Sequence, residues 1–243
     1  MLSIQGDLHT HTLACGHALG TVTENLAFAA RKGHRFMAAT EHCGRVPVAP
    51  HLWYFNNLMR MPREHDGVIL LYGVECNIID RSGTVDLPEW YLKHLDLVIA
   101  SAHVETFEGD RSNPDYTEMY CAAARNPWVD IIGHCGDPRF SHDCVSLVRT
   151  CRDHGKIIEI NASSPKGRRG SAERCREIAA LCKQYGVMVS VSSDAHCPQN
   201  VGEVGDALDI LREVGFPQEL ILNGSYEQLR RVLSQRRGTQ LPE

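Results

Sequence analysis

A chain of 243 residues is long enough to bury a full hydrophobic core and fits one large α/β domain. Its formal net charge of −5 excludes a general electrostatic attraction to nucleic acid or anionic membranes, so we expect neither long nucleic acid nor a membrane as a partner. The opening segment lacks the apolar region of a secretory signal, so the ten cysteines indicate reduced thiols in a cytoplasmic protein. The apolar runs are far shorter than the ~20 residues of a membrane helix.

The first half of the chain alternates short apolar runs with helical patterns. Thr21 and Glu24 have the spacing of a capping box, which predicts a helix that continues to Lys32 and ends at Gly33. Further helices are expected over 54–64 and 118–125, and residues 80–83 have the composition of a turn. The apolar runs predict four strands, over residues 3–11, 36–39, 68–79 and 95–102.

The second half repeats this pattern with clearer helices. Ile178, Leu181 and Cys182 follow the i, i+3, i+4 spacing of a helix over 171–185 that ends at Gly186. Other helices are expected over 144–154, 204–214 and 226–234, and strands over 129–132, 156–160 and 187–191. Seven strands that alternate with helices predict a parallel sheet closed into a barrel, in a single domain covering residues 1–243.

Two pairs of metal-ligand side chains stand near opposite ends of the chain. His9 and His11 are two residues apart, and Asp194 and His196 have the same spacing. An i, i+2 pair on a strand points both side chains to one face. Most of the remaining candidates end or closely follow apolar runs: His17, His42, Glu75, His103 and His134. Since barrel active sites lie at the carboxyl ends of the strands, these nine side chains predict one site that holds several metal ions.

The ligand types indicate the metal and the chemistry. Seven imidazoles and two carboxylates suit zinc, manganese or iron better than calcium or magnesium. Closely spaced metal ions can activate water and clamp a phosphoryl group, so this set predicts a hydrolase that needs no serine or cysteine nucleophile. The other histidines fall in helices, loops or turns and are expected to be structural or exposed: His34, His51, His65, His94, His142 and His154.

The same motifs carry a family resemblance. Residues 7–11 (Asp-Leu-His-Thr-His), 40–42 (Thr-Glu-His), 73–75 (Gly-Val-Glu), 133–134 (Gly-His) and 193–196 (Ser-Asp-Ala-His), with His103, resemble the PHP (polymerase and histidinol phosphatase) superfamily. Segments outside the ligand motifs are similar to the YcdX-type branch of its phosphatases: 50–57, 62–63, 66–67, 159–164 and 175–177. The resemblance covers nearly the whole chain, from Asp7 to about residue 236.

This resemblance implies the PHP fold, a distorted (β/α)7 TIM-like barrel, and three divalent transition metals, usually zinc. The expected catalytic residues are Glu75, as the ligand shared by two metals, and Asp194, which can also accept or donate a proton. The implied ligand sets are His9, His11, Glu75 and Asp194 for one metal, Glu75, His103 and His134 for a second, and His17, His42 and His196 for a third.

The chain departs from the family beside its ligands. Glu41 replaces the usual aspartate, and we expect it to alter the surroundings of a ligand rather than the ligand itself. Four cysteines directly adjoin ligand positions, and alternation along an extended chain turns such neighbours away from the metal. We therefore expect packing rather than ligation from the cysteines at positions 15, 43, 76, 135 and 197.

The implied activity is that of a phosphatase, which cleaves a small phosphomonoester of a metabolite with metal-activated water. Alternatives are a histidinol phosphatase, a nucleotide phosphodiesterase or nuclease, and a metal-binding module without turnover; a homo-oligomer is compatible with each. Arg168 and Arg169 lie in a loop after an expected strand and suit phosphate oxygens, the alternative being a solvated turn. The aromatic segment 51–55 either covers a ring-bearing substrate or belongs to the core.

Overall fold

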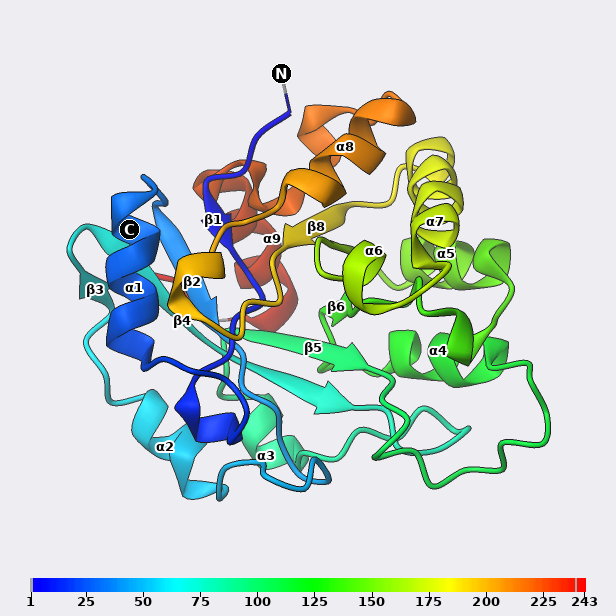
Figure 1. Cartoon of the computed structure of the whole chain (residues 1–243), viewed down its shortest axis with the longest axis horizontal. Coiled ribbons are helices and arrows are strands. Elements are labelled where there is room, and N and C mark those ends of the chain that lie inside the picture. The colour runs from blue at the N-terminus through cyan, green and yellow to red at the C-terminus, as the bar shows by residue number, and fades with distance from the viewer. Residues whose placement is uncertain (1, 239) are drawn as a thin grey trace.

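The computed structural model describes residues 2–238 and 240–243 (Figure 1). Within that part of the chain, parallel strands pair in the order β1-β2-β4-β5-β6-β7-β8, and β3 pairs with β4 in the antiparallel sense. The sheet curls into a nearly closed barrel, which confirms the expected α/β barrel fold. The strands are β1 (Gly6–Asp7), β2 (Phe36–Ala39), β3 (Glu64–His65), β4 (Val68–Asn77), β5 (Leu97–Ser101), β6 (Ile131–Ile132), β7 (Ile157–Asn161) and β8 (Val189–Ser192).

Helices follow most strands and cover the outside of the sheet; α4, α5 and α7 stand side by side there in Figure 1. The capping box is present: Thr21 Oγ1 accepts from the backbone N–H of Glu24 at 3.2 Å, and Glu24 Oε2 accepts from that of Thr21 at 2.8 Å. The helices are α1 (Val22–Arg31), α2 (Trp53–Leu58), α3 (Glu89–Leu92), α4 (Thr117–Arg125), α5 (Cys144–Asp153), α6 (Ser164–Gly167), α7 (Ser171–Tyr185), α8 (Gly205–Glu213) and α9 (Tyr226–Arg237).

The barrel interior contains its own apolar layer near the amino ends of the strands. Strands β2, β4, β5, β6 and β7 supply it with alternate residues, because successive side chains of a strand point to opposite faces. Helix α9 closes this end of the barrel by packing Leu229 and Leu233 against the layer. The interior residues of the strands are Phe36, Ala38, Ile69, Leu71, Leu97, Ile99, Ile131 and Ile157.

The seam between β1 and β8 is closed by one side chain as well as by backbone. Asn223 Nδ2 donates to the carbonyl oxygens of Gly6 at 2.8 Å and Val191 at 2.7 Å, and its Oδ1 accepts from the Val191 N–H at 3.0 Å. Nearer the carboxyl ends, Thr10 and Ala195 form a parallel bridge. Asn223 is fully buried, so it satisfies backbone groups that no water reaches.

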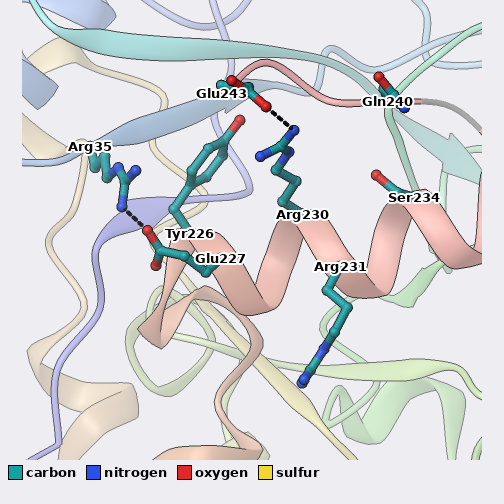
Figure 2. A pocket seen from close by; sticks show the side chains of 8 residues that line it. All are labelled: Arg35, Tyr226, Glu227, Arg230, Arg231, Ser234, Gln240 and Glu243. Carbon is teal, nitrogen blue, oxygen red and sulfur yellow. Dashed lines mark hydrogen bonds and ion pairs between the residues drawn. The ribbon is translucent and has the colours of Figure 1, made fainter.

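The last residues of the chain pack against α9 at the amino end of the barrel (Figure 2). The Tyr226 hydroxyl donates to the Pro242 carbonyl at 2.7 Å, and Arg230 pairs with Glu243 at 3.1 Å. Arg35 pairs with Glu227 beside a cavity of about 380 Å³. Because Arg35 directly precedes β2, this cavity lies at the end of the barrel opposite to the expected ligands.

Two expected elements differ from the structure. The helix expected over 54–64 is wrong beyond Leu58: α2 ends there, and Glu64 begins the short strand β3 on the edge of β4. The strand expected over 3–11 is regular only at Gly6–Asp7, because beyond it Thr10 forms a single bridge with Ala195 and shares its other bonds with the side chain of Thr40. Among the described residues, no helix is long and apolar enough to cross a membrane.

Candidate metal centre

Alternation along the strands carries several expected ligands into the barrel. On β4, Glu75 lies four residues beyond the interior Leu71, so it points to the same side. His42 stands in the same relation to Ala38 beyond β2, and His103 to Ile99 beyond β5. Apolar side chains therefore fill the amino half of the barrel, and ligand-type side chains converge at its carboxyl end.

The segment after β1 reaches the site by a different route. Thr10 Oγ1 donates to the Ala38 carbonyl at 2.7 Å, and Thr40 Oγ1 accepts from the Thr10 N–H at 3.0 Å. These bonds add to the backbone bonds from the Thr40 N–H to the Thr10 carbonyl and from the His11 N–H to the Ala195 carbonyl, and together they hold the histidines on either side of Thr10. Asp7 is not at the ligand cluster: its buried carboxylate accepts hydrogen bonds from the backbone of Ser193 at 3.1 Å and Gly202 at 2.8 Å, which ties β1 to the end of β8.

His134 and Asp194 enter the cluster through unusual backbone. Their φ angles are +24° and +56°, in the left-handed region that non-glycine residues rarely adopt. The Glu159 Oε2 atom accepts from the His134 N–H at 2.8 Å and so supports one of these turns. Strain of this kind costs on the order of 1–3 kcal/mol and concentrates at functional sites.

The first expected ligand set converges on one point. His9 Nε2 lies 3.3 Å from Glu75 Oε2 and 3.6 Å from Asp194 Oδ1. His11 Nε2 lies 3.5 Å and 3.3 Å from the same two oxygens. Four ligand atoms from the start, middle and end of the chain thus surround a single position.

The second set uses the other oxygen of the same carboxylate. Glu75 Oε1 lies 2.9 Å from His134 Nε2 and 3.5 Å from His103 Nε2. Glu75 Oε2, which faces the first set, also lies 2.8 Å from His42 Nδ1. Glu75 therefore stands between groups of imidazoles, as a shared ligand would.

The third set lies at the more open edge of the cluster. His17 Nε2 and His196 Nε2 face each other at 2.9 Å. The His42 ring stacks on His17 with 5.2 Å between centroids and lies 6.0 Å from His196. The structure thus brings all nine expected side chains together.

Hydrogen bonds on the far side of the rings determine which nitrogen faces the cluster. Nδ1 of His9 donates to Glu159 Oε1 at 2.8 Å. Nδ1 of His17 faces the Cys15 carbonyl at 3.1 Å, and Nδ1 of His196 faces the Asp194 carbonyl at 3.0 Å. Each oxygen is an acceptor, so Nδ1 carries a proton and Nε2 faces inward, where it presents a lone pair whenever the ring is neutral.

His103 is oriented through a longer chain of bonds. Its Nδ1 donates to Asn77 Oδ1 at 2.7 Å, and Asn77 Nδ2 donates to the Cys43 carbonyl at 2.9 Å and Asp86 Oδ2 at 2.6 Å. The two acceptors define the orientation of the Asn77 amide. Asp86 also holds the Arg45 N–H at 2.8 Å, so it fixes the loop after β2 together with the ligand.

These residues fit a bound cation. Among the described residues, His9 Nε2, His11 Nε2 and Glu75 Oε2 are buried without a hydrogen-bond partner. Buried acceptors that face one another repel unless a proton or a metal ion lies between them. Nitrogen and carboxylate donors in this ratio are the ligands of zinc and similar transition metals.

The charges of the cluster also favour cations. Burial opposes ionisation of Glu75, but His9, His42 and His103 outweigh it and hold the pKa of this carboxyl well below its ordinary value. Burial likewise opposes ionisation of Asp194, and His9 and His11 outweigh it, so its pKa also lies well below the usual range. Both carboxylates are therefore ionised at neutral pH, the form that binds metal.

The cysteines beside the ligands are mostly buried, and the ten cysteines of the described chain are free thiols. Cys43 Sγ donates to Asp86 Oδ1 at 3.1 Å, close to Cys76. Glu41 packs near His11 and Cys15, where burial raises the pKa of its carboxyl to about 7. Glu41 Oε2 lies 4.0 Å from His11 Nδ1, on the side of the ring away from the ligand cluster.

The two expected phosphate-binding arginines differ in position. Arg168 is only 15 % exposed, and its guanidinium lies 3.5 Å from Asp194 Oδ2 and 3.6 Å from Asp137 Oδ2. Arg169 is exposed. Of the two, Arg168 is the arginine whose charge lies against an expected ligand.

The aromatic segment 51–55 lies partly in the core and partly at the surface. Phe55 is fully buried in the core, and the Tyr54 hydroxyl points to Glu41 at 3.4 Å. Trp53 is 70 % exposed and stacks edge-on with His51. A cavity of about 310 Å³ above the ligands is lined instead by residues of the loops after β2 and β5, together with His17.

Sequence reasoning assigned no role to Glu159, Asn77 or Asp86, although each holds a group of the site. A signal for the first existed: Glu159 is a carboxylate inside the apolar run Ile-Ile-Glu-Ile, where alternation from Ile157 points it into the barrel. Asn77 follows Glu75 by two residues and shares its face. The role of Asp86 depends on a loop and had no such signal.

Comparisons with known proteins identify the family of this chain. The PHP domain family matches residues 7–194. A probable phosphatase of Caldanaerobacter subterraneus subsp. tengcongensis is 44% identical over 95% of this chain and 91% of its own length. A probable phosphatase of Clostridium botulinum is 39% identical over 93% of each chain.

Solved structures share the fold at low sequence identity. A histidinol phosphate phosphatase from Lactococcus lactis, complexed with zinc, L-histidinol and phosphate, matches with a TM-score of 0.62 and 15% identity over 88% of this chain and 95% of that one. A chain of archaeal ribonuclease P with mature tRNA matches with a TM-score of 0.60 and 14% identity over 94% and 90%. These two likenesses concern the fold alone. The chain belongs to the PHP-domain family and is an enzyme of its phosphatase class.

Proposed function

We propose that this protein hydrolyses a small phosphate monoester at a centre of three divalent metal ions held by the nine clustered side chains. The convergence of inward-facing Nε2 atoms around the two oxygens of Glu75 carries this proposal. Zinc is the first choice for these donors, with manganese or iron as alternatives. When bound, such ions supply a nucleophilic water near neutral pH and neutralise charge on the phosphoryl oxygens.

The chain's own residues supply position and charge. Glu75 and Asp194 are the proposed catalytic residues, because each presents one oxygen to the histidines of the first set. The second oxygen of Asp194 faces Asn161 at 3.2 Å and Arg168 at 3.5 Å. Arg168 can therefore hold a phosphate oxygen beside the ligands, and guanidinium groups suit that task. The expected role of Arg169 in substrate binding stays a secondary proposal.

The surroundings restrict the substrate to a small molecule. The cavity above the ligands is about 310 Å³, at the lower end of the roughly 300–1,000 Å³ of small-molecule sites. We also propose that residues 1–243 act as one domain in the reducing cytoplasm, which suits the free cysteines. A histidinol phosphatase is the second candidate, since the Lactococcus lactis structure with the same fold contains L-histidinol and phosphate.

Elemental analysis and a substrate panel test the proposal together. Protein reconstituted with zinc or manganese should carry close to three ions per chain and release phosphate from monoesters. The panel includes 4-nitrophenyl phosphate, histidinol phosphate, bis(4-nitrophenyl) phosphate and a dinucleotide. His11→Ala should lose metal and activity, whereas His154→Ala, at the exposed end of α5, serves as the control. One ion or fewer per chain would contradict the trinuclear centre, and diester cleavage without monoester cleavage would replace the phosphatase by a phosphodiesterase.

A further inference from the structure

The cavity above the ligand cluster has two chemically different walls. His17, His42 and His103 line its base. Val46, Pro47 and Val48 form an apolar wall, and Glu105 and Thr106 supply a polar part of the lining. A phosphate held at the cluster would therefore place the group esterified to it between these walls.

The apolar wall is a built structure rather than a loose loop. The Ala49 N–H donates to the Val46 carbonyl at 2.9 Å, which closes a turn around Pro47 and Val48. Gly16 packs so closely on this turn that a Cβ at its position would lie 2.5 Å from Val48 Cβ. The preceding residues are held to Asp86 through the Arg45 N–H. The wall is thus fixed from three sides, yet Val48 keeps 49 % of its surface exposed.

Glu105 contributes a negative charge to the lining of the cavity. Its side chain is exposed, and its charge acts on the guanidinium of Arg139. The pKa of Arg139 is raised mainly by its hydrogen bond to Asp137, with a smaller contribution from Glu105. Arg139 itself pairs with Asp137 at 2.7 Å. A second anionic group on a substrate in the cavity would face the like charge of Glu105.

We propose that this cavity makes the enzyme selective for phosphate monoesters of compact apolar or aromatic alcohols that carry no second anion. The inference rests on the proposed function, because it requires phosphate at the metal centre. Val46, Pro47 and Val48 bury the apolar group, and Glu105 rejects carboxylates and further phosphates. A volume of about 310 Å³ admits a single ring or a short chain but not a dinucleotide.

A matched pair of esters tests the selectivity. Metal-loaded enzyme should cleave 4-methylphenyl phosphate with a kcat/KM at least tenfold above that for 4-carboxyphenyl phosphate, mainly through KM. Glu105→Gln should raise kcat/KM for 4-carboxyphenyl phosphate. The ratio of kcat/KM between the two esters should therefore become smaller. Val48→Asn should raise KM for 4-methylphenyl phosphate several-fold more than for methyl phosphate, which has no ring to fill the cavity. Trp53→Ala is the control, since this exposed side chain does not line the cavity.

Calorimetry provides a readout that does not depend on turnover. Benzylphosphonate should bind the metal-loaded protein at least tenfold more tightly than 4-carboxybenzylphosphonate, and Glu105→Gln should reduce that difference without changing metal content. Phosphate release from both esters at equal kcat/KM would overturn the selectivity while leaving the proposed function intact. Selective binding of benzylphosphonate without hydrolysis of any monoester would instead overturn the proposed function. The binding selectivity of the cavity would then still hold.

Discussion

The imidazole of His9 donates its Nδ1 proton to Glu159 Oε1 at 2.8 Å in the closed interior of the barrel, across 150 positions of sequence. The other oxygen of Glu159 accepts from the His134 N–H at 2.8 Å and from Asn161 Nδ2 at 3.2 Å. One buried carboxylate thus orients a proposed ligand of the first set and supports the backbone of a proposed ligand of the second.

Glu159→Gln should weaken metal binding about 10–100-fold, because groups that orient metal ligands commonly contribute that much. An amide has one acceptor and one donor side, so it cannot accept from His9 and His134 together. The measurement is the Kd for zinc by competition with a chelating dye, with Glu173→Gln on the exposed face of α7 as the control. If Glu159 acts only in folding, the variant would lower the melting temperature of metal-free protein without changing this Kd.

Glu75→Gln and Cys76→Ser form a second matched test, since the two residues are neighbours on β4. Glu75 faces the ligand cluster with both oxygens, and its loss should remove metal ions and reduce phosphate release to background. Cys76 is fully buried on the other face of the strand and should tolerate serine with metal content and most activity retained. Loss of metal in Cys76→Ser would show that the thiols near Asp86 belong to the metal centre.

Arg168→Ala should raise KM for phosphate esters about tenfold or more, because a hydrogen bond to a charged group contributes about 1.5–3 kcal/mol. Arg169→Ala is the matched comparison, since it removes the same charge from the adjacent, exposed position. Steady-state kinetics of both variants at equal metal content provide the measurement. An equal rise of KM in both variants would mean that the loop acts through its net charge rather than through the contact of Arg168 with Asp194.

His142 should make the fold sensitive to acid. Burial lowers the pKa of this imidazole from 6.5 to about 4. Above pH 6.5 the ring is neutral in both states, but between pH 6.5 and 4 the unfolded chain binds a proton that the folded chain does not. The free energy of unfolding should therefore fall with pH across this window, by up to about 3 kcal/mol from this group.

Urea denaturation of metal-free protein between pH 7 and pH 4 measures this effect. His142→Phe keeps an aromatic ring against Tyr120, whose centroid lies 4.6 Å from that of His142, and removes the titrating group. The difference in unfolding free energy between wild type and variant should shrink or reverse as the pH falls, because only the wild type loses this contribution. A difference that stays constant over the range would contradict the assignment.

The amino-acid pattern by itself determined the class of fold and the identity of the clustered side chains. Alternating apolar runs and helical segments require a parallel sheet with helices outside it, and that topology places the ends of the strands at one face. Ligand-type residues such as His42, Glu75 and His103 end or follow those runs, so their meeting could be predicted from position in the chain. The nine side chains converge as their positions required.

Local patterns were insufficient where side chains replace regular backbone pairing. The strand expected over 3–11 is interrupted where the hydroxyl groups of Thr10 and Thr40 join the backbone bonds, and the helix expected to reach Glu64 ends at Leu58, before Glu64 pairs with β4. Hydrophobic periodicity predicts neither the interruption of the strand nor the end of the helix, since each involves contacts with residues from another part of the chain.

Only the tertiary structure decided how the site is oriented and what surrounds it. The bond from His9 to Glu159 and the chain from His103 through Asn77 to Asp86 join residues that are distant in sequence, and they determine which ring nitrogen faces inward. The same holds for Arg168, which the fold turns toward Asp194 while its neighbour faces solvent. A sequence lists donors and acceptors, but the directions of their lone pairs and protons exist only after the strands have been brought together.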